Sequence, residues 1–374
     1  MNLGIYIHIP FCKSKCFYCD FYSCTNYTNV ESYINAVCEE ILSETELLGQ
    51  ANIDTIYIGG GTPSLIDEKH IVKLLDLLKL FCIEEPEITI EVNPESVTKQ
   101  KLQTYYEAGI NRLSIGLQSA NDNTLKKIGR IATIKDFEKA YNLAVEIGFK
   151  NISCDVIIGL PDENIDMFNK TVDYVLSFKN ITHISAYSLE LHENTKLDFL
   201  VNNNFLSLPD DELERDMKYL LDNKLEQAGF VRYEISNYAK PGFESKHNLK
   251  YWNQEQYLGF GAAASSFISS RRSTNISDID KYIENIQKGI STNELVEEMD
   301  KLDLIKEYII LRLRLAKGID SDLFRNKFKM DLNELFGDKI KILIEKGLLY
   351  KKDNKIMLTY KGEDLANQVW QEFI

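Results

Sequence analysis

Three cysteines lie close together near the start of the chain, at Cys12, Cys16 and Cys19. Their C-x3-C-x2-C spacing places three thiolates in one loop that directly follows an apolar run. Thiolates are soft ligands that suit iron–sulfur clusters. A 4Fe-4S cubane has four irons, so three cysteines leave one iron free to bind a small molecule. The spacing therefore predicts a 4Fe-4S cluster with one open coordination position.

Two other interpretations of the cysteines are a zinc site and a set of inert core thiols. A structural zinc site needs four ligands, usually as two paired half-sites, and the sequence contains no second C-x2-C or H-x3-H pair. Core thiols are usually scattered, as Cys38, Cys82 and Cys154 are here. Cys24 lies close enough to reach a cluster but stands outside the spacing, so it is either an extra ligand or a spare thiol.

Short β-rich runs alternate with amphipathic stretches along the first half of the chain, at a repeat of roughly thirty residues, the length of a βα unit. The predicted strands are Leu3 to Ile9, Thr55 to Ile58, Ile88 to Val92, Arg112 to Gly116, Ser153 to Ile158 and Ile184 to Leu189. The predicted helices include Val30 to Leu48, Lys69 to Phe81, Lys135 to Ile147 and Ile165 to Phe178. Six such units predict an α/β fold, a partial (β/α)6 barrel that is an incomplete relative of the TIM barrel.

Glycine and polar residues gather at the ends of these strands, where parallel βα folds place their functional groups. A glycine-rich turn, Gly59 to Ser64, follows the second strand and lets backbone groups approach a ligand closely. Glu91 and Gln118 end the third and fourth strands, and Asp155 lies in the fifth. Arg130 could pair bidentately with a carboxylate. Each residue alone is more commonly a capping or surface group, but together they predict a site for ribose hydroxyls or an ammonium group.

These motifs resemble the oxygen-independent coproporphyrinogen III oxidase family of radical S-adenosylmethionine (SAM) proteins. The resemblance covers most of the chain and rests on the runs Tyr6 to Cys12, Gly59 to Pro63, Ile90 to Val92, Arg112 to Ser119 and Asp155 to Pro161. It implies that the three cysteines hold the cluster and that an electron, from a donor such as flavodoxin or ferredoxin, reaches the sulfonium of SAM to yield a 5'-deoxyadenosyl radical. It also implies that SAM is contacted by Tyr6, Gly60, Gly61, Thr62, Glu91, Gln118, Arg130 and Asp155.

Two departures separate the chain from the oxidases of that family. The oxidase-like motif continues C-x-C after the third cysteine, whereas Asp20 and Phe21 follow Cys19 here. The oxidases also resemble one another in a long leader that helps to cover the substrate, whereas Met1 directly precedes the first strand. Both departures speak against decarboxylation of coproporphyrinogen.

A later segment resembles the heme-chaperone branch of the same family. The run His247 to Trp252 matches its H-N-x-x-Y-W heme-binding signature. A neutral imidazole can ligate heme iron, and the tyrosine and tryptophan offer flat faces to a porphyrin, although such a run can also simply pack a loop against the barrel. Relatives commonly carry a histidine near the position of Ser265, and this chain does not. If His247 ligates heme, the predicted candidate for a second ligand is His192.

The sequence predicts two domains, a radical SAM partial barrel over residues 1–235 and a C-terminal domain over residues 236–374 that includes the heme-binding segment. The end of the chain predicts a helix at Leu302 to Leu315, helices at Ser321 to Lys327 and Leu332 to Gly347, and a hairpin at Leu348 to Leu358. This order resembles a winged helix. We expect this module to cover the porphyrin site or to dock an acceptor, because the charge balance disfavours DNA binding.

Composition narrows the class of protein further. The net charge of −14 disfavours a nucleic-acid partner, which would need a basic face. Seven cysteines are too few for a disulfide scaffold, and no transmembrane segment or signal peptide is predicted, so we expect a cytoplasmic protein. The leading prediction is a heme chaperone that binds a 4Fe-4S cluster, SAM and heme, and passes heme to an acceptor protein. The alternative is an enzyme, an oxygen-independent coproporphyrinogen III oxidase.

Overall fold

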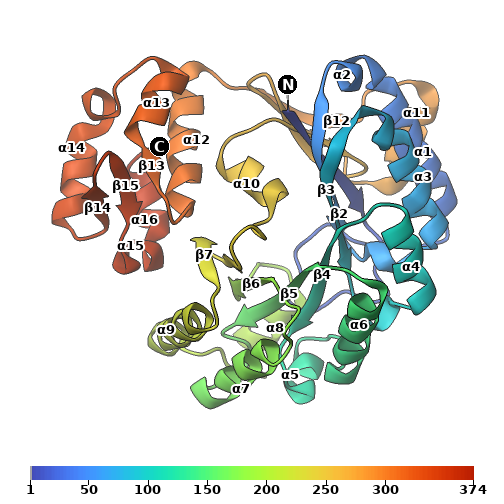
Figure 1. The fold of residues 1–374 in the computed structure, drawn as a ribbon, viewed down its shortest axis with the longest axis horizontal. Coiled ribbons are helices and arrows are strands. Elements are labelled where there is room, and N and C mark those ends of the chain that lie inside the picture. Colours follow the sequence, from blue (N-terminus) through green and yellow to red (C-terminus); the bar gives the residue numbers. More distant parts are fainter. Residues whose placement is uncertain (1) are drawn as a thin grey trace.

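Six parallel strands form the centre of the structure, a computed structural model that describes residues 2–374 (Figure 1). Neighbouring strands pair in chain order, as Ile5 with Ile56 and Ile90 with Leu113 show. The strands are β1 (Asn2–Ile9), β2 (Asn52–Gly60), β3 (Cys82–Val92), β4 (Arg112–Gln118), β5 (Asn151–Ile158) and β6 (His183–Ser188). The predicted strands and the partial (β/α)6 arrangement are confirmed.

Helices cover the outer side of the curved sheet (Figure 1). Their apolar faces pack on Leu3, Ile5, Ile7 and the matching residues of the other strands in one large core. Local signals fix their ends: Thr133 and Asp136 form a capping box at the start of one helix, and Gly148 ends it with φ of 115°. The helices of this core are α1 (Val30–Ser43), α2 (Thr45–Gly49), α3 (Glu68–Leu78), α4 (Lys99–Glu107), α6 (Ile134–Ile147), α7 (Ile165–Leu176) and α9 (Asp211–Gln227). Two shorter helices, α5 (Asp122–Lys127) and α8 (Lys196–Asn202), lie outside it.

The inner face of the sheet is polar, unlike the apolar layers that fill a closed TIM barrel. Arg112 is only 1% exposed there. His183 bonds the Ser153 hydroxyl through Nδ1 and the Tyr233 hydroxyl through Nε2, both at 2.8 Å. Burial lowers the pKa of His183, so this imidazole is neutral near physiological pH. His183 is thus satisfied by its neighbours on the inner face, whereas the Arg112 Nε is buried with no hydrogen-bond partner among the described residues.

The central sheet continues beyond the six predicted strands at both ends. Next to β1 lie β9 (Tyr257–Phe260), which runs parallel to it, and the antiparallel strands β10 (Ser265–Ile268), β11 (Arg271–Asn275) and β12 (Asn293–Glu298). Next to β6 lie β8 (Asn237–Ala239) and β7 (Val231–Glu234). Two further helices belong to this part, α10 (Lys246–Trp252) and α11 (Ile279–Lys288). The domain boundary at residues 235 and 236 stays a prediction, and the strands of the large sheet extend to Glu298.

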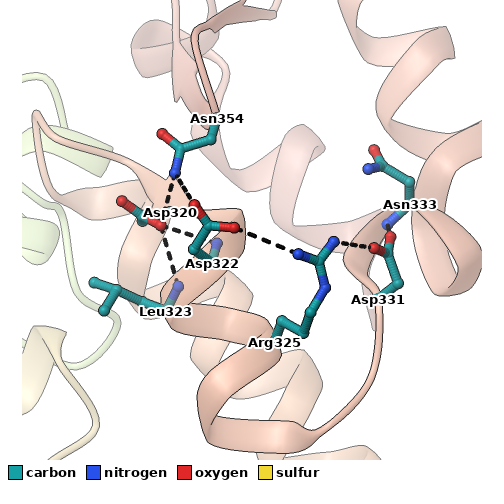
Figure 2. A network of polar contacts seen from close by, with 7 residues as sticks. All are labelled: Asp320, Asp322, Leu323, Arg325, Asp331, Asn333 and Asn354. Carbon is teal, nitrogen blue, oxygen red and sulfur yellow. Dashed lines mark hydrogen bonds and ion pairs between the residues drawn. The ribbon is translucent and has the colours of Figure 1, made fainter.

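A small C-terminal unit has its own apolar core and a three-stranded antiparallel sheet. Its order of helix, strand, two helices and hairpin agrees with the predicted winged-helix pattern. In Figure 2, Asp320 caps the helix that follows it, and Asn354 of the hairpin turn donates to both Asp320 and Asp322. The elements are α12 (Lys301–Arg314), β13 (Ile319–Asp320), α13 (Ser321–Phe328), α14 (Leu332–Glu345), β14 (Leu349–Lys352), β15 (Lys355–Leu358), α15 (Tyr360–Asp364) and α16 (Ala366–Gln371).

Backbone bonds join the small unit to the edge of the large sheet. The Ile235 amide donates to the Arg314 carbonyl at 3.0 Å, and the Ala316 amide donates to the Tyr233 carbonyl at 3.0 Å. Arg232 adds a two-pronged ion pair with Glu363, at 2.6 and 2.8 Å. Across residues 2–374, no helix is both long and apolar enough to cross a membrane.

Candidate cluster and cofactor site

The three predicted cluster ligands lie on the loop that follows β1. The loop closes through backbone bonds, from the Cys12 amide to the Cys24 carbonyl at 2.9 Å and from the Cys24 amide to the Pro10 carbonyl at 2.7 Å. Cys12, Cys16 and Cys19 all line one cavity of about 420 Å³. Cys24 does not line it, and its thiol donates to the Asn26 carbonyl at 3.0 Å. The structure thus separates the triad from the fourth cysteine of the loop.

Metal binding at the loop would have to displace protons from two of the half-buried thiols. Burial raises the pKa of Cys12, with a hydrogen bond from Thr62 opposing it, and burial raises the pKa of Cys19 to about 11. Thiols with such pKa values are protonated near pH 7 unless metal binding removes their protons. Within residues 2–374, no three His, Cys, Asp or Glu side chains gather closely enough to share one metal ion. Three cysteines are one ligand short of a structural zinc site, whereas a 4Fe-4S cluster can take one cysteine on each of three irons and leave the fourth iron open.

The glycine-rich turn after β2 lies directly against the cluster loop. The Gly61 amide donates to the Ile9 carbonyl at 2.8 Å, and the Thr62 amide donates to the Phe11 carbonyl at 2.8 Å. A Cβ atom on Gly61 would lie 2.8 Å from the Ile9 carbonyl oxygen, so only glycine allows this approach. The neighbouring Gly60 has φ of 106°, which also favours glycine. The turn thus fixes the position of the cluster loop relative to the sheet.

Two buried carboxylates line the same cavity. Glu91 of β3 accepts from the Tyr57 hydroxyl at 2.8 Å and from the Gly60 amide at 3.1 Å. Burial, together with the nearby Asp155 charge, raises the pKa of Glu91 to about 7. Asp155 of β5 accepts from the Ser114 hydroxyl at 3.0 and 3.2 Å, and burial raises its pKa as well. A ligand with hydroxyl or ammonium donors would offset this cost of burial.

Arg130 connects the cofactor cavity to the cluster loop. Its guanidinium donates to the Gly116 carbonyl at 2.7 Å and to the Asn93 amide oxygen at 3.2 Å, and approaches the Cys16 sulfur at 3.9 Å. Its Nε is buried and has no hydrogen-bond partner among the described residues. Gln118 lines the cavity beside it with φ of 70°, a conformation rarely adopted by residues other than glycine. A buried, unpaired guanidinium nitrogen and a strained strand end both suit a ligand site.

Two of the predicted site residues do not line this cavity. The Tyr6 hydroxyl lies 3.0 Å from His8 Nδ1, and Tyr6 lines a neighbouring cavity instead. His247 of α10 is 1% exposed and lies below Tyr57, with the two rings stacked at 5.3 Å between centroids. Its Nδ1 lies 2.8 Å from the Thr55 hydroxyl and its Nε2 lies 2.8 Å from the Tyr251 hydroxyl. Both ring nitrogens are therefore occupied in this conformation.

The structure also adds residues that the sequence did not single out. Tyr57, Ser114 and Tyr187 line the cavity, as does His192, which the sequence offered only as a heme ligand. The tyrosines and the serine lie on the same strand faces as Glu91 and Asp155, so the two-residue alternation along β2, β4 and β6 carried a signal. That signal was weak, because tyrosine and serine are common on partly buried strand faces.

Comparison with known proteins agrees with this geometry. Residues 6–175 match the Radical SAM superfamily, and residues 299–365 match the HemN C-terminal domain. Among solved structures, the coproporphyrinogen III oxidase HemN of Escherichia coli superposes with a TM-score of 0.86 at 22% identity, covering 100% of this chain and 90% of that one. At this identity, the likeness shows the fold alone. The fold and the cysteine loop thus define a radical SAM protein, a class that uses a 4Fe-4S cluster and SAM.

Curated relatives narrow the family. The heme chaperone HemW of Bacillus subtilis is 38% identical over 99% of this chain and 98% of its own length. HemW of Lactococcus lactis is 34% identical, with 99% and 96% covered, and HemW of Mycobacterium tuberculosis is 31% identical, with 98% and 93% covered. The chain belongs to the HemW family of radical SAM proteins.

Proposed function

We propose that this protein is a heme chaperone that carries a 4Fe-4S cluster and SAM, binds heme and passes it to an acceptor protein. The observation that carries the proposal is similarity along nearly the whole chain to curated proteins named heme chaperone HemW. The separation of the cysteine triad from Cys24 supports the cluster part of the proposal. The proposal includes a location in the cytoplasm and an electron donor such as flavodoxin or ferredoxin.

In this proposal, Cys12, Cys16 and Cys19 hold the cluster, and the open iron supplies a binding position and an electron for SAM. The cavity residues fit this ligand by their chemistry. Glu91 and Asp155 accept hydrogen bonds from ribose hydroxyls or the ammonium group, and the free Nε of Arg130 offers a donor to a carboxylate. Gly60, Gly61, Thr62 and Gln118 shape the wall, and Tyr6 supports it from behind through its stack on Tyr57.

Heme transfer is tested with anaerobically reconstituted protein. Hemin should bind at a defined stoichiometry with a shifted Soret band. Heme should then pass from this protein to an apo-cytochrome b-type acceptor faster than free hemin in buffer binds to the same acceptor. Incubation with coproporphyrinogen III and a reductant should give no catalytic formation of protoporphyrinogen. Failure to bind hemin, or protoporphyrinogen formed over many turnovers, would reject the chaperone function in favour of the oxidase.

A further inference from the structure

Arg112, the first residue of β4, lies on the inner face of the sheet below the two carboxylates of the cluster cavity. It is 1% exposed, on a strand that is buried at every position. Side chains on a strand alternate between its faces, so Arg112 shares a face with Ser114, which donates to Asp155 at 3.0 Å. On the neighbouring strand β3, Thr89 pairs with Arg112. Glu91, two residues further along β3, pairs with Ser114. Arg112 and the two carboxylates thus belong to one polar face.

The positive charge of Arg112 is not neutralised by a direct contact. Its Nε is buried without a hydrogen-bond partner, and within residues 2–374 the guanidinium has no carboxylate oxygen within the 4.0 Å of an ion pair. The hydroxyl of Thr89, its partner across β3 and β4, is also buried and unpartnered among the described residues. A buried charge is unfavourable unless other charges balance it. The charge of Arg112 therefore calls for balancing groups that lie further away on the same face.

The titratable groups around Arg112 respond to its charge. Burial raises the pKa of Glu91 to about 7 and raises the pKa of Asp155, and the Arg112 charge opposes both changes. Burial lowers the pKa values of His183 and His247, and the Arg112 charge lowers them further. Arg112 is thus a cation that favours charged carboxylates and neutral imidazoles on the inner face.

We propose that Arg112 is a positioning residue for SAM, whose buried charge balances the Glu91 and Asp155 carboxylates that face the ligand. This inference rests on the proposed function. The hydrogen bonds that these carboxylates accept come from hydroxyl and backbone amide groups, which carry no net charge. An ionised carboxylate accepts strong hydrogen bonds from ribose hydroxyls and an ammonium group, whereas a protonated one directs its own hydrogen at the ligand. Arg112 does not line the cavity, so it acts on SAM through the carboxylates.

The first test measures SAM affinity of reconstituted full-length protein by calorimetry, from about pH 5.5 to about pH 8.5. Arg112→Gln should weaken binding at least about tenfold near pH 7 and move the midpoint of the pH profile upward by about one unit, because Glu91 and Asp155 hold their protons more tightly. Arg112→Lys keeps the charge and should restore the midpoint. Arg271→Gln removes an arginine whose side chain is 51% exposed on β11 and should match wild type. An unmoved midpoint in Arg112→Gln would overturn the inference, since a structural defect weakens binding equally at every pH.

Other titratable groups face the two carboxylates, and the comparison between variants separates them from Arg112. Burial raises the pKa of each facing tyrosine, so these remain neutral over the range tested: Tyr6, Tyr18, Tyr57, Tyr187 and Tyr251. Burial lowers the pKa of each facing histidine of the interior, with the same result: His8, His183 and His247. The remaining charged or titratable groups of the cavity and the inner face are common to all variants and cancel, as does the amino group of SAM: Lys15, Asp20, Glu87, Arg130, Glu190 and His192.

The second test does not require Arg112→Gln to fold by itself. The double variant Glu91→Gln with Asp155→Asn removes the charges that Arg112 balances. Arg112→Gln should lower the urea midpoint of the wild-type chain but leave that of the double variant unchanged or higher, because a buried cation without counter-charges is unfavourable. Equal lowering in both backgrounds would overturn the inference. If Arg112→Gln alone does not fold, folding of the triple variant supports the inference and its failure to fold overturns it. Wild-type protein that binds no SAM at any pH would instead reject the SAM part of the proposed function, and the urea comparison would still test the charge balance.

Discussion

The cluster loop and helix α10 were both identified from short sequence motifs, yet the side chains of the first line a cavity and the histidine of the second is enclosed. The thiols of Cys12, Cys16 and Cys19 face a cavity of about 420 Å³. The imidazole of His247 is 1% exposed, and each of its nitrogens has a partner at 2.8 Å. A motif thus marks residues with a special role, but only the tertiary structure shows whether the reactive atom is available to a ligand. The thiols of the cluster loop are available to a ligand, whereas the histidine of α10 is hydrogen-bonded to the Tyr251 side chain.

The strongest test of this contrast is removal of a cluster ligand. Cys16→Ala should abolish iron and sulfide incorporation in anaerobic reconstitution, because the open-iron arrangement has no spare protein ligand in the cavity. Wild-type protein should approach four irons and four sulfides per chain. Cys24→Ala is the matched control, since its thiol is bonded to the Asn26 carbonyl, and it should reconstitute fully. The reverse pattern would mean that the ligands of the loop are misassigned.

For the stability of the protein without its cluster, the order of effects should be reversed: replacing His247 should destabilise the fold more than replacing Cys16. His247→Ala should lower the free energy of unfolding by about 3 kcal/mol, because the buried Thr55 and Tyr251 hydroxyls would each lose a partner. Cys16→Ala should change it by less than about 0.5 kcal/mol, since this thiol is partly exposed. Urea unfolding followed by circular dichroism measures both. Equal stability of the two variants would contradict the view that the His247 imidazole supports the fold while the Cys16 thiol is available to a ligand.

Measuring SAM binding tests whether the carboxylates of the cluster cavity contact a ligand. Glu91→Ala and Asp155→Ala should each weaken SAM binding roughly ten- to a hundredfold, because each removes a hydrogen bond worth about 1 to 3 kcal/mol. The cluster should remain. Asp173→Ala, an exposed carboxylate paired with Lys224, serves as the control and should bind normally. Calorimetry that gave unchanged affinity for both cavity variants would place the SAM site elsewhere.

The smallest expected effect is a pH dependence from α10. Burial, with the nearby Lys250 charge, lowers the pKa of His247 to about 3. Because the unfolded chain would bind a proton below about pH 6.5 and the folded chain would not, stability should fall as the pH drops from about 6.5 towards about 3. Between about pH 7 and about pH 5.5, His247 should account for about 1 kcal/mol of this loss. His247→Gln should show a correspondingly shallower decline in urea titrations, whereas identical slopes would indicate a solvated imidazole.

Much of the fold followed from the sequence because its signals are local. Alternating apolar residues and strand-end glycines predicted β1 to β6, and the structure confirms them. The strands β9 to β12 were missed because they lack such a pattern. β12 is exposed at every position and β11 carries arginine, serine and threonine, so these strands form through pairing with neighbours. β9 pairs with β1 from the opposite end of the large sheet domain's sequence, and a partner so distant along the chain leaves no local mark.

The candidate site likewise has residues that local signals predicted and features that depend on long-range packing. The spacing of the cysteines and the placement of Glu91, Gln118 and Asp155 at strand ends predicted one gathering of groups, and all of them line one cavity. The sequence could not show that Tyr6 faces the neighbouring cavity, because its direction depends on how β9 and α10 pack beside β1. Nor could it show that Arg130 donates to the Gly116 carbonyl and approaches the sulfur of Cys16, which lies 114 residues earlier.

The sequence by itself therefore determined two features of the protein, the thiolate triad and the parallel βα scaffold. The spacing of the cysteines predicts the first, and the periodicity of the apolar residues predicts the second. The tertiary structure decided which groups are presented and which are enclosed. Cys24 turns away from its three neighbours, and His247 is sealed behind Tyr251, because long-range packing sets the direction of a side chain and the dielectric around it. Those two properties depend on residues far along the chain, and they decide whether a thiol or an imidazole can meet a ligand.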